Sequence, residues 1–304
     1  MNVTGDDERK IKYSDLDKII FPSDGITKED LVHYYRKIAR IILPHLQERA
    51  LTMHRFPGGI EDEGFYQQEV PPYFPSWIGR ASIAKKEGGS LTHVVCNDKG
   101  TLLYLANQAC ITAHVWLSRI SEPDKPDKMI FDLDPQKGDF RSVVSPARAL
   151  KKLLEELELP AYLMNTGSKG VHVVVPIKPQ LPFDQVRHLA VGIASRLVAK
   201  YPREITTEMR KKKRGGRLYV DCRRNSFGIT TVAPYSVRAL AGATVAAPLD
   251  WEEFDEGTFH PQKYNIYSVI RRLGQKEDPW KDIYKNRVSL KQALNQYEMP
   301  GGYS

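Results

Sequence analysis

Residues 128–137 read KMIFDLDPQK, a run with the apolar character of a buried β-strand except for two aspartates. Aspartate is depleted in strands, and an ionised carboxylate is costly to bury unless it is paired or bound to a cation. Side chains alternate along a strand, so Asp132 and Asp134 are predicted to project from one face while Phe131 and Leu133 occupy the other. The stretch therefore predicts a strand that carries two neighbouring carboxylates.

A third carboxylate, Asp221, ends another predicted strand, again after apolar residues and before basic ones. Neighbouring carboxylates repel each other unless a cation lies between them, and oxygen ligands suit Mg²⁺ or Mn²⁺. Three acids on adjacent strands are what a two-metal phosphoryl-transfer site requires: one ion activates the attacking hydroxyl, and the other steadies a triphosphate. A D-x-D pair is common, however, and a strand end with solvated acids is the alternative.

Two basic segments accompany the acids. In NTGSKGVHV, residues 165–173, the backbone amides of a small turn, with Ser168 and Lys169, can hold phosphate oxygens, although the Walker A spacing is absent. RKKKRGGR, residues 210–217, places six basic residues in eight and can follow a nucleic-acid backbone. Taken singly, an ordinary hairpin turn and a solvated loop are the alternatives for these two segments.

Composition sets further limits. A chain of 304 residues with 41% hydrophobic residues can bury a full core, and its net charge of +8 is compatible with a polyanionic partner. No run approaches the roughly 18 apolar residues that cross a bilayer, and the N-terminal segment lacks the apolar core of a signal peptide, so a cytoplasmic protein with no membrane partner is expected. The three cysteines form no C-x-x-C pair, so we expect buried thiols and neither a disulfide framework nor a zinc ribbon.

The periodicity of apolar residues predicts four helices and two hairpins. The helices are expected over 27–43 with Thr27 as N-cap, over 101–119, from a start at Ser145 and Pro146, and over 183–200. The hairpins are expected to pair AYLMNTG (161–167) with VHVVVPI (171–177), and ITTEM (205–209) with RLYVDC (217–222). Hairpins mixed with helices predict an α+β fold with mainly antiparallel sheets.

Four segments, in this order and spacing, resemble the polymerase domain of bacterial multifunctional DNA ligase D, a branch of the archaeo-eukaryotic primase superfamily that serves non-homologous end joining. They are FDLDP (131–135), TGSKGVHV (166–173), YVDCRRNS (219–226) and APYSVR (233–238). The resemblance implies one two-lobed primase-polymerase domain over 1–304 with an RNA-recognition-motif-like (RRM-like) catalytic palm. Its approximate parts are an N-terminal lobe over 1–125, the palm over 126–275 and a C-terminal tail over 276–304.

The resemblance also implies roles for individual residues. Asp132, Asp134 and Asp221 are expected to bind two Mn²⁺ or Mg²⁺ ions as catalytic acids. Thr166 falls where the family usually has a serine close to the sugar 2′-hydroxyl, which fits a preference for ribonucleotides. The residues expected to contact the triphosphate are Ser168, Lys169, His172, Arg238, and His114 from the predicted helix over 101–119.

The N-terminal part of the chain is similar to the family's DNA-contacting region. Lys18 and Lys28 are expected to bind the 5′-phosphate at the far side of a gap or break, Arg55 to lie near the template, and Phe65 and Tyr66 to stack on a template base. Two positions depart from the family, since lysine is common where Gln68 stands and a basic residue is frequent where His54 stands.

The activity implied is template-dependent addition of NTPs or dNTPs to DNA 3′ ends, which fills gaps at double-strand breaks in the nucleoid. No K-x-D-G ligase nucleophile occurs in the sequence. We therefore expect a free-standing polymerase that works with a separate DNA ligase and a Ku-like end-binding protein.

Three alternatives remain open. The first is a replicative or damage-tolerant primase-polymerase of the same superfamily. The second is a phosphatase of the haloacid dehalogenase type, whose D-x-D motif usually continues with Gly-Thr where this chain has Pro135. The third is a single-strand-binding module without catalysis, which would be indifferent to metal ions and to the loss of Asp134.

Overall fold

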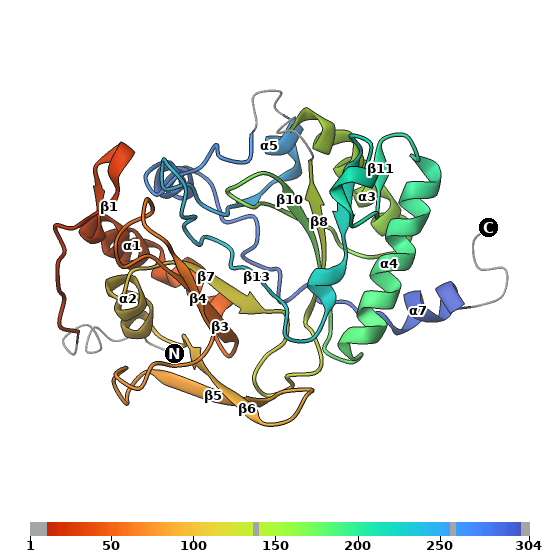
Figure 1. The fold of residues 1–304 in the computed structure, drawn as a ribbon. Helices are drawn as coiled ribbons and strands as arrows, with labels where there is room; N and C mark the ends of the chain where they lie inside the picture. The colour runs from red at the N-terminus through yellow and green to blue at the C-terminus, as the bar shows by residue number, and fades with distance from the viewer. Residues whose placement is uncertain (1–10, 136–139, 256–259, 299–304) are drawn as a thin grey trace. The chain divides into compact units, whose positions relative to one another are not determined.

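The computed structural model describes residues 11–135, 140–255 and 260–298 (Figure 1). Gln136 and Lys137 of the stretch quoted above lie outside these ranges. The described chain forms a mixed α+β fold of two compact units. None of the described helices is long and apolar enough to span a membrane.

The two units are interleaved along the chain. The first unit contains the chain up to Trp116 together with 230–247 and 263–278, and the second contains 117–229, 248–262 and the C-terminal part from Pro279. Residues 230–247 and 263–275, which fall within the range expected for the palm, thus pack in the first unit, as do residues 276–278 of the expected C-terminal tail.

The first unit is built on a sheet with the strand order β13-β7-β3-β6-β5, with β4 paired to β3. Helix α1 begins where the sequence predicts, because the Thr27 hydroxyl accepts from the Asp30 amide while the Asp30 carboxylate accepts from the Thr27 amide. The elements are β1 (Ile19–Phe21), β2 (Ile26–Thr27), α1 (Lys28–Leu46), β3 (Ala50–Arg55), β4 (Phe65–Gln67), β5 (Gly79–Ala84), β6 (Ser90–Val95), α2 (Lys99–Asn107), β7 (Cys110–Trp116), β13 (Thr230–Val232) and α6 (Ser268–Gln275), with a 3₁₀ turn at Pro22–Asp24.

The helix predicted over 101–119 is wrong in its second half. Helix α2 ends at Asn107, and Ala109 takes a left-handed backbone conformation with φ of 55°. The chain then extends as β7, which pairs with β3 on one side and β13 on the other. His114 therefore lies on a strand, because hydrogen bonds to distant strands override the local helical spacing.

The second unit is built on a sheet with the strand order β11-β12-β8-β10-β9-β14. Helices α3 and α4 contact each other and strand β8, and they cover one face of this sheet (Figure 1). This is the arrangement expected of the RRM-like palm. The elements are β8 (Lys128–Asp134), α3 (Arg141–Glu156), β9 (Tyr162–Asn165), β10 (Val171–Pro176), α4 (Phe183–Lys200), β11 (Ile205–Thr206), β12 (Leu218–Asp221), β14 (Pro248–Leu249), α5 (Trp251–Asp255) and α7 (Lys291–Glu298), with 3₁₀ turns η3 (Lys211–Lys213) and η4 (Arg223–Asn225).

Two of the predicted elements in this unit differ from the structure. Helix α3 begins at Arg141, and Pro146 lies inside it without the amide that would bond to the preceding turn, so Ser145 and Pro146 are not its start. The β9–β10 hairpin and helix α4 are confirmed. The second hairpin is wrong: β11 and β12 pair in parallel, because the segment between them is long enough to return the chain to the same end of the sheet.

Candidate active site

The three acids lie on one face of the second unit's sheet, and two of them, Asp132 and Asp221, lie in one cross-strand row. On β8, Phe131 and Leu133 are fully buried on the side of the helices, and alternation places Asp132 and Asp134 on the opposite face, as the sequence predicts. Asp221 on β12 is the cross-strand partner of Asp132. Directly opposite residues share a face with Cβ atoms about 5 Å apart, so the sheet register brings Asp132 and Asp221 together, and alternation along β8 adds Asp134 to the same face.

Asp132 occupies the centre of this row. His172 on β10 is its partner on the other side, with the ring Nε2 3.6 Å from Oδ1. The Arg224 Nε lies 3.3 Å from Oδ2. Burial raises the pKa of the Asp132 carboxyl, but His172 and Arg224 together lower it by more, so this pKa lies below its usual value. Asp132 is therefore a carboxylate at neutral pH.

Asp134 lies at the end of β8 in a more open position. Burial raises the pKa of its carboxyl, and the neighbouring charge of Asp132 raises it further, against three basic side chains. One of these is Arg214, whose Nη1 lies 3.9 Å from the Asp134 Oδ2. Arg214 itself is buried, stacks on the Tyr219 ring with its guanidinium carbon 3.8 Å from the ring centroid, and donates to two backbone carbonyls. The basic run at 210–217 is thus anchored beside the acids.

The Asp221 carboxylate forms an ion pair with Arg223. The Arg223 amide donates to the Asp221 Oδ1 at 2.8 Å, and its guanidinium donates to both carboxylate oxygens. Among the described residues, no three acid, histidine or cysteine side chains converge as they would around a metal ion. The carboxylates share a face, but each is turned towards a basic side chain.

The loop between β9 and β10 is pinned against the acid-bearing strand. A Cβ atom at Gly170 would lie 2.1 Å from the Leu133 carbonyl oxygen, so only glycine permits this close approach. The Thr166 hydroxyl donates to the Gly170 carbonyl at 3.0 Å and accepts from the amides of Ser168 and Gly170. Lys169 is exposed and acts electrostatically on Asp134. The predicted triphosphate-binding loop therefore lies beside the carboxylates.

A second group of predicted residues gathers in the first unit. His54 stacks on Tyr66 with ring centroids 4.0 Å apart and planes 6° apart, and His114 lies edge-on to Tyr66 at 5.5 Å. Arg238 is close enough to act electrostatically on His54. Tyr66 and Phe65 are 61% and 43% exposed, so neither ring is a core residue. His114 and Arg238 thus lie together, in a different unit from the other predicted triphosphate contacts.

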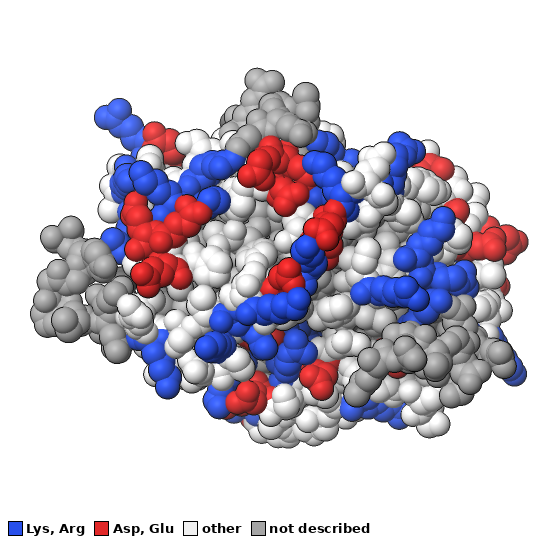
Figure 2. Space-filling view, turned by 180° about the vertical axis from the view of Figure 1, so that it is seen from behind, with Lys and Arg blue, Asp and Glu red and all other residues white. Residues whose placement is uncertain are grey.

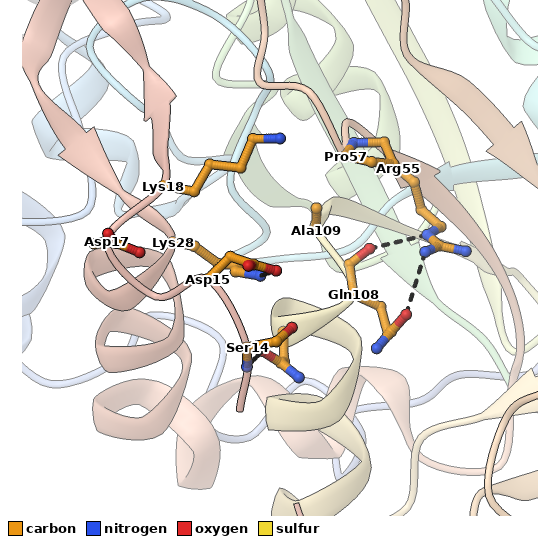
Figure 3. Close-up of a pocket in the computed structure, with 10 residues that line it drawn as sticks. Ser14, Asp15, Asp17, Lys18, Lys28, Arg55, Pro57, Gln108 and Ala109 are labelled. Atoms are coloured by element: carbon orange, nitrogen blue, oxygen red, sulfur yellow. Dashed lines mark hydrogen bonds and ion pairs between the residues drawn. The ribbon is translucent and has the colours of Figure 1, made fainter. Parts of the chain in front are cut away.

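The predicted 5′-phosphate residues line a pocket of the first unit (Figure 3). This pocket has a volume of about 590 Å³, with Lys18 and Lys28 on one side and Arg55 on the other. Lys28 is 5% exposed, and its Nζ lies 3.7 Å from the Asp15 carboxylate. Arg55 is also buried, donating to the Gln108 backbone carbonyl and to the side chains of Gln67, Tyr73 and Gln108. Arg55 is therefore held rigidly at the pocket wall.

We expect the His54 ring to remain neutral at pH values well below the usual pKa of a histidine. Burial, and then the charge of Arg238, lower the pKa of its ring to about 4. A depressed histidine pKa means that the unfolded chain binds the proton more readily, so the stability that neutral His54 contributes is lost as pH falls from about 6.5 towards 4. An NMR titration of the His54 ring should show no protonation at pH 6, and a midpoint near 6.5 would contradict the stacked, half-buried geometry.

Several residues at the acids carry no role in the sequence-based predictions. Arg223 and Arg224 pair with Asp221 and Asp132, and Asn225 is fully buried beneath them. The sequence signal for these three residues is a run of basic and amide side chains directly after a strand-end acid.

Net charge is a weaker guide to the site. Figure 2 shows a face that carries both acidic and basic side chains, so the charge of +8 does not gather there into one basic surface.

Comparison with known proteins identifies the family of this chain. The family described as LigD, primase-polymerase domain, matches residues 27–280. The bifunctional non-homologous end joining protein LigD of Bacillus subtilis is 34% identical over 91% of this chain and 44% of its own length, and the multifunctional LigD of Mycolicibacterium smegmatis is 31% identical over 88% of this chain and 35% of its own length. This chain thus spans less than half of either relative.

A solved structure supports the same conclusion. The polymerase domain of Mycobacterium tuberculosis Ligase D, in complex with DNA, superposes with a TM-score of 0.87 at 30% identity, covering 92% of this chain and all of that one. Since both the sequence family and the fold agree along most of the chain, the protein belongs to the LigD primase-polymerase domain family.

Proposed function

We propose that this chain is a DNA-directed nucleotidyltransferase of non-homologous end joining, which extends 3′ ends and fills gaps on a template. The observation that carries the proposal is the row formed by Asp221, Asp132 and His172 across three adjacent strands. Carboxylates on one face of a sheet, beside a glycine-rich loop with a lysine, suit the positioning and charge neutralisation that phosphoryl transfer requires.

The donor set fits a divalent cation. Asp132, Asp134 and Asp221 offer hard oxygen atoms on one face. Two of these acids are paired with arginines in the structure, Asp221 with Arg223 and Asp132 with Arg224. These three residues would hold Mn²⁺ or Mg²⁺ after the arginines turn aside. Two such ions, when bound, lower the pKa of the attacking 3′-hydroxyl and stabilise the triphosphate charge.

The nucleotide would be held by the loop between β9 and β10. Ser168 and Lys169 offer a hydroxyl and an ammonium group for the triphosphate, and the buried Nδ1 of His172 has no hydrogen-bond partner among the described residues. His114 and Arg238 are proposed to complete the binding of the triphosphate. Thr166 is proposed to favour ribonucleotides through the sugar 2′-hydroxyl, although its own hydroxyl is engaged within the loop in this structure.

The pocket with Lys18 and Lys28 is proposed to receive a downstream 5′-phosphate. Phe65 and Tyr66 are exposed, as template-stacking rings need to be. This pocket favours end joining over a replicative or damage-tolerant primase, which has no downstream phosphate to bind. Membership of the family argues against the phosphatase alternative. A DNA ligase and a Ku-like protein are the partners we propose for the repair reaction.

The test is extension of a labelled primer across a short gap, with Mn²⁺ or Mg²⁺ and with NTPs or dNTPs in parallel. We expect template-directed filling that weakens when the downstream 5′-phosphate is removed, and faster addition of NTPs than of dNTPs. A folded protein that binds DNA but adds no nucleotide under any of these conditions would refute the polymerase proposal and leave the single-strand-binding module.

A further inference from the structure

A side chain of the 3₁₀ turn η4, which follows β12, links the two acid-bearing strands β8 and β12. Strand β12 pairs with β8 from Tyr219 to Asp221 and then turns away, so the part of β8 that precedes Asp132 lacks that partner. At this point the Asn225 side chain takes the partner's place. Its Oδ1 accepts from the Ile130 amide at 2.8 Å, and its Nδ2 donates to the Ile130 carbonyl at 2.7 Å.

The same side chain also holds β12. Asn225 Nδ2 donates to the Cys222 carbonyl at 3.0 Å, and Cys222 directly follows Asp221. Ile130 lies two residues before Asp132, on the same side of β8. One fully buried amide therefore connects the backbone beside Asp132 to the backbone beside Asp221.

We propose that Asn225 is a positioning residue that sets the separation of Asp132 and Asp221 for a divalent cation. The inference rests on the proposed function in taking these acids as the cation's ligands. Arg223 and Arg224 now hold the two carboxylates, and a cation must displace them. Among the described residues, the Asn225 side chain bonds only to backbone groups, so an entering cation does not compete with it, and the strands keep their spacing while the arginines move.

Asparagine suits this position better than its nearest relatives. Aspartate retains the acceptor for the Ile130 amide but loses the donor for both carbonyls and adds a buried charge. Glutamine adds a methylene group in a fully buried site. Serine is too short to reach both groups of Ile130 and the Cys222 carbonyl at once, so it keeps only part of the link.

The test measures binding of Mn²⁺ alone to the whole chain, from the electron paramagnetic resonance signal of the free ion, at a temperature where circular dichroism shows the variants folded. Asn225→Ala is expected to weaken Mn²⁺ binding by about tenfold, as loss of residues that orient metal ligands usually does, and Asn225→Ser by less. The milder Asn225→Ser variant replaces Asn225→Ala if the latter does not fold.

The matched control is Trp280→Phe in the same unit. Trp280 is buried and donates from Nε1 to the Leu163 carbonyl at 3.1 Å, so this variant also loses a buried bond to a strand but leaves the acids untouched. Its Mn²⁺ affinity should equal that of the wild type. Folded Asn225 variants with wild-type Mn²⁺ affinity would overturn the inference, whatever their stability.

The outcomes also separate this inference from the proposed function. If the wild type binds no Mn²⁺, the metal site itself is refuted and the role of Asn225 with it. If the wild type binds Mn²⁺ and the Asn225 variants bind it more weakly, but no protein adds nucleotides to DNA, the role of Asn225 stands and the polymerase proposal fails.

Discussion

Replacing Asp132 by asparagine is expected to slow nucleotide addition by about a thousandfold or more. The carboxylate lies between Asp221 and His172 at the centre of the proposed metal site. Loss of metal-ion catalysis removes several kcal/mol of transition-state stabilisation, and about 1.4 kcal/mol is a factor of ten in rate. Since asparagine keeps the size and shape of the side chain, the fold and DNA binding should persist. The measurement is the rate of single-nucleotide addition at saturating Mn²⁺ and DNA.

The matched control is Asp282→Asn, which removes one carboxylate from the same unit. Asp282 pairs with Lys285 and is more exposed than Asp132. Its replacement should leave the rate of addition close to that of the wild type. A rate for Asp132→Asn within tenfold of the wild type, with the protein folded and DNA bound, would remove Asp132 from the chemistry.

Replacing Lys28 by alanine is expected to abolish most of the preference for DNA with a downstream 5′-phosphate. Burial lowers the pKa of the Lys28 ammonium, against the nearby Asp15, which raises it. A buried ammonium gains from a doubly charged phosphate, and hydrogen bonds to charged groups contribute about 1.5–3 kcal/mol. The dissociation constant for 5′-phosphorylated gapped DNA should therefore rise by roughly tenfold to a hundredfold, measured by fluorescence anisotropy.

The control for charge is Lys37→Ala, which removes an exposed lysine from the same helix α1. It should weaken binding of both DNAs slightly and equally, as a loss of non-specific attraction does. Lys28→Ala should leave the affinity for unphosphorylated gapped DNA nearly unchanged. An equal loss for the two DNAs would mean that Lys28 supports the fold or attracts DNA in general, and that the pocket does not read the phosphate.

Local patterns predicted the parts of the site that lie within one strand or turn. Alternation along β8 places Asp132 and Asp134 on one face, and the glycines of residues 165–173 mark the turn between β9 and β10. The N-cap at Thr27 was equally readable, because a capping box involves residues only three positions apart. In each case the deciding interactions lie close together in the sequence.

The failures have the opposite cause. The apolar spacing after Asn107 is compatible with a helix, but β7 is an inner strand between β3 and β13, and those distant partners decide its conformation. The parallel pairing of β11 with β12 also depends on how the chain returns after the basic run at 210–217. Periodicity describes what a segment favours alone, whereas hydrogen bonds between distant strands decide what it adopts.

From the sequence one can derive the chemistry of the site: carboxylates at strand ends, a glycine-rich turn with a lysine, and basic residues beside them. Their mutual arrangement required the tertiary structure. The register that sets Asp221 opposite Asp132, the pairing of Arg224 with Asp132 and the hydrogen bonds of Asn225 to Ile130 all join residues about ninety positions apart. Such contacts are set by cooperative packing and cross-strand hydrogen bonds, which no local pattern encodes.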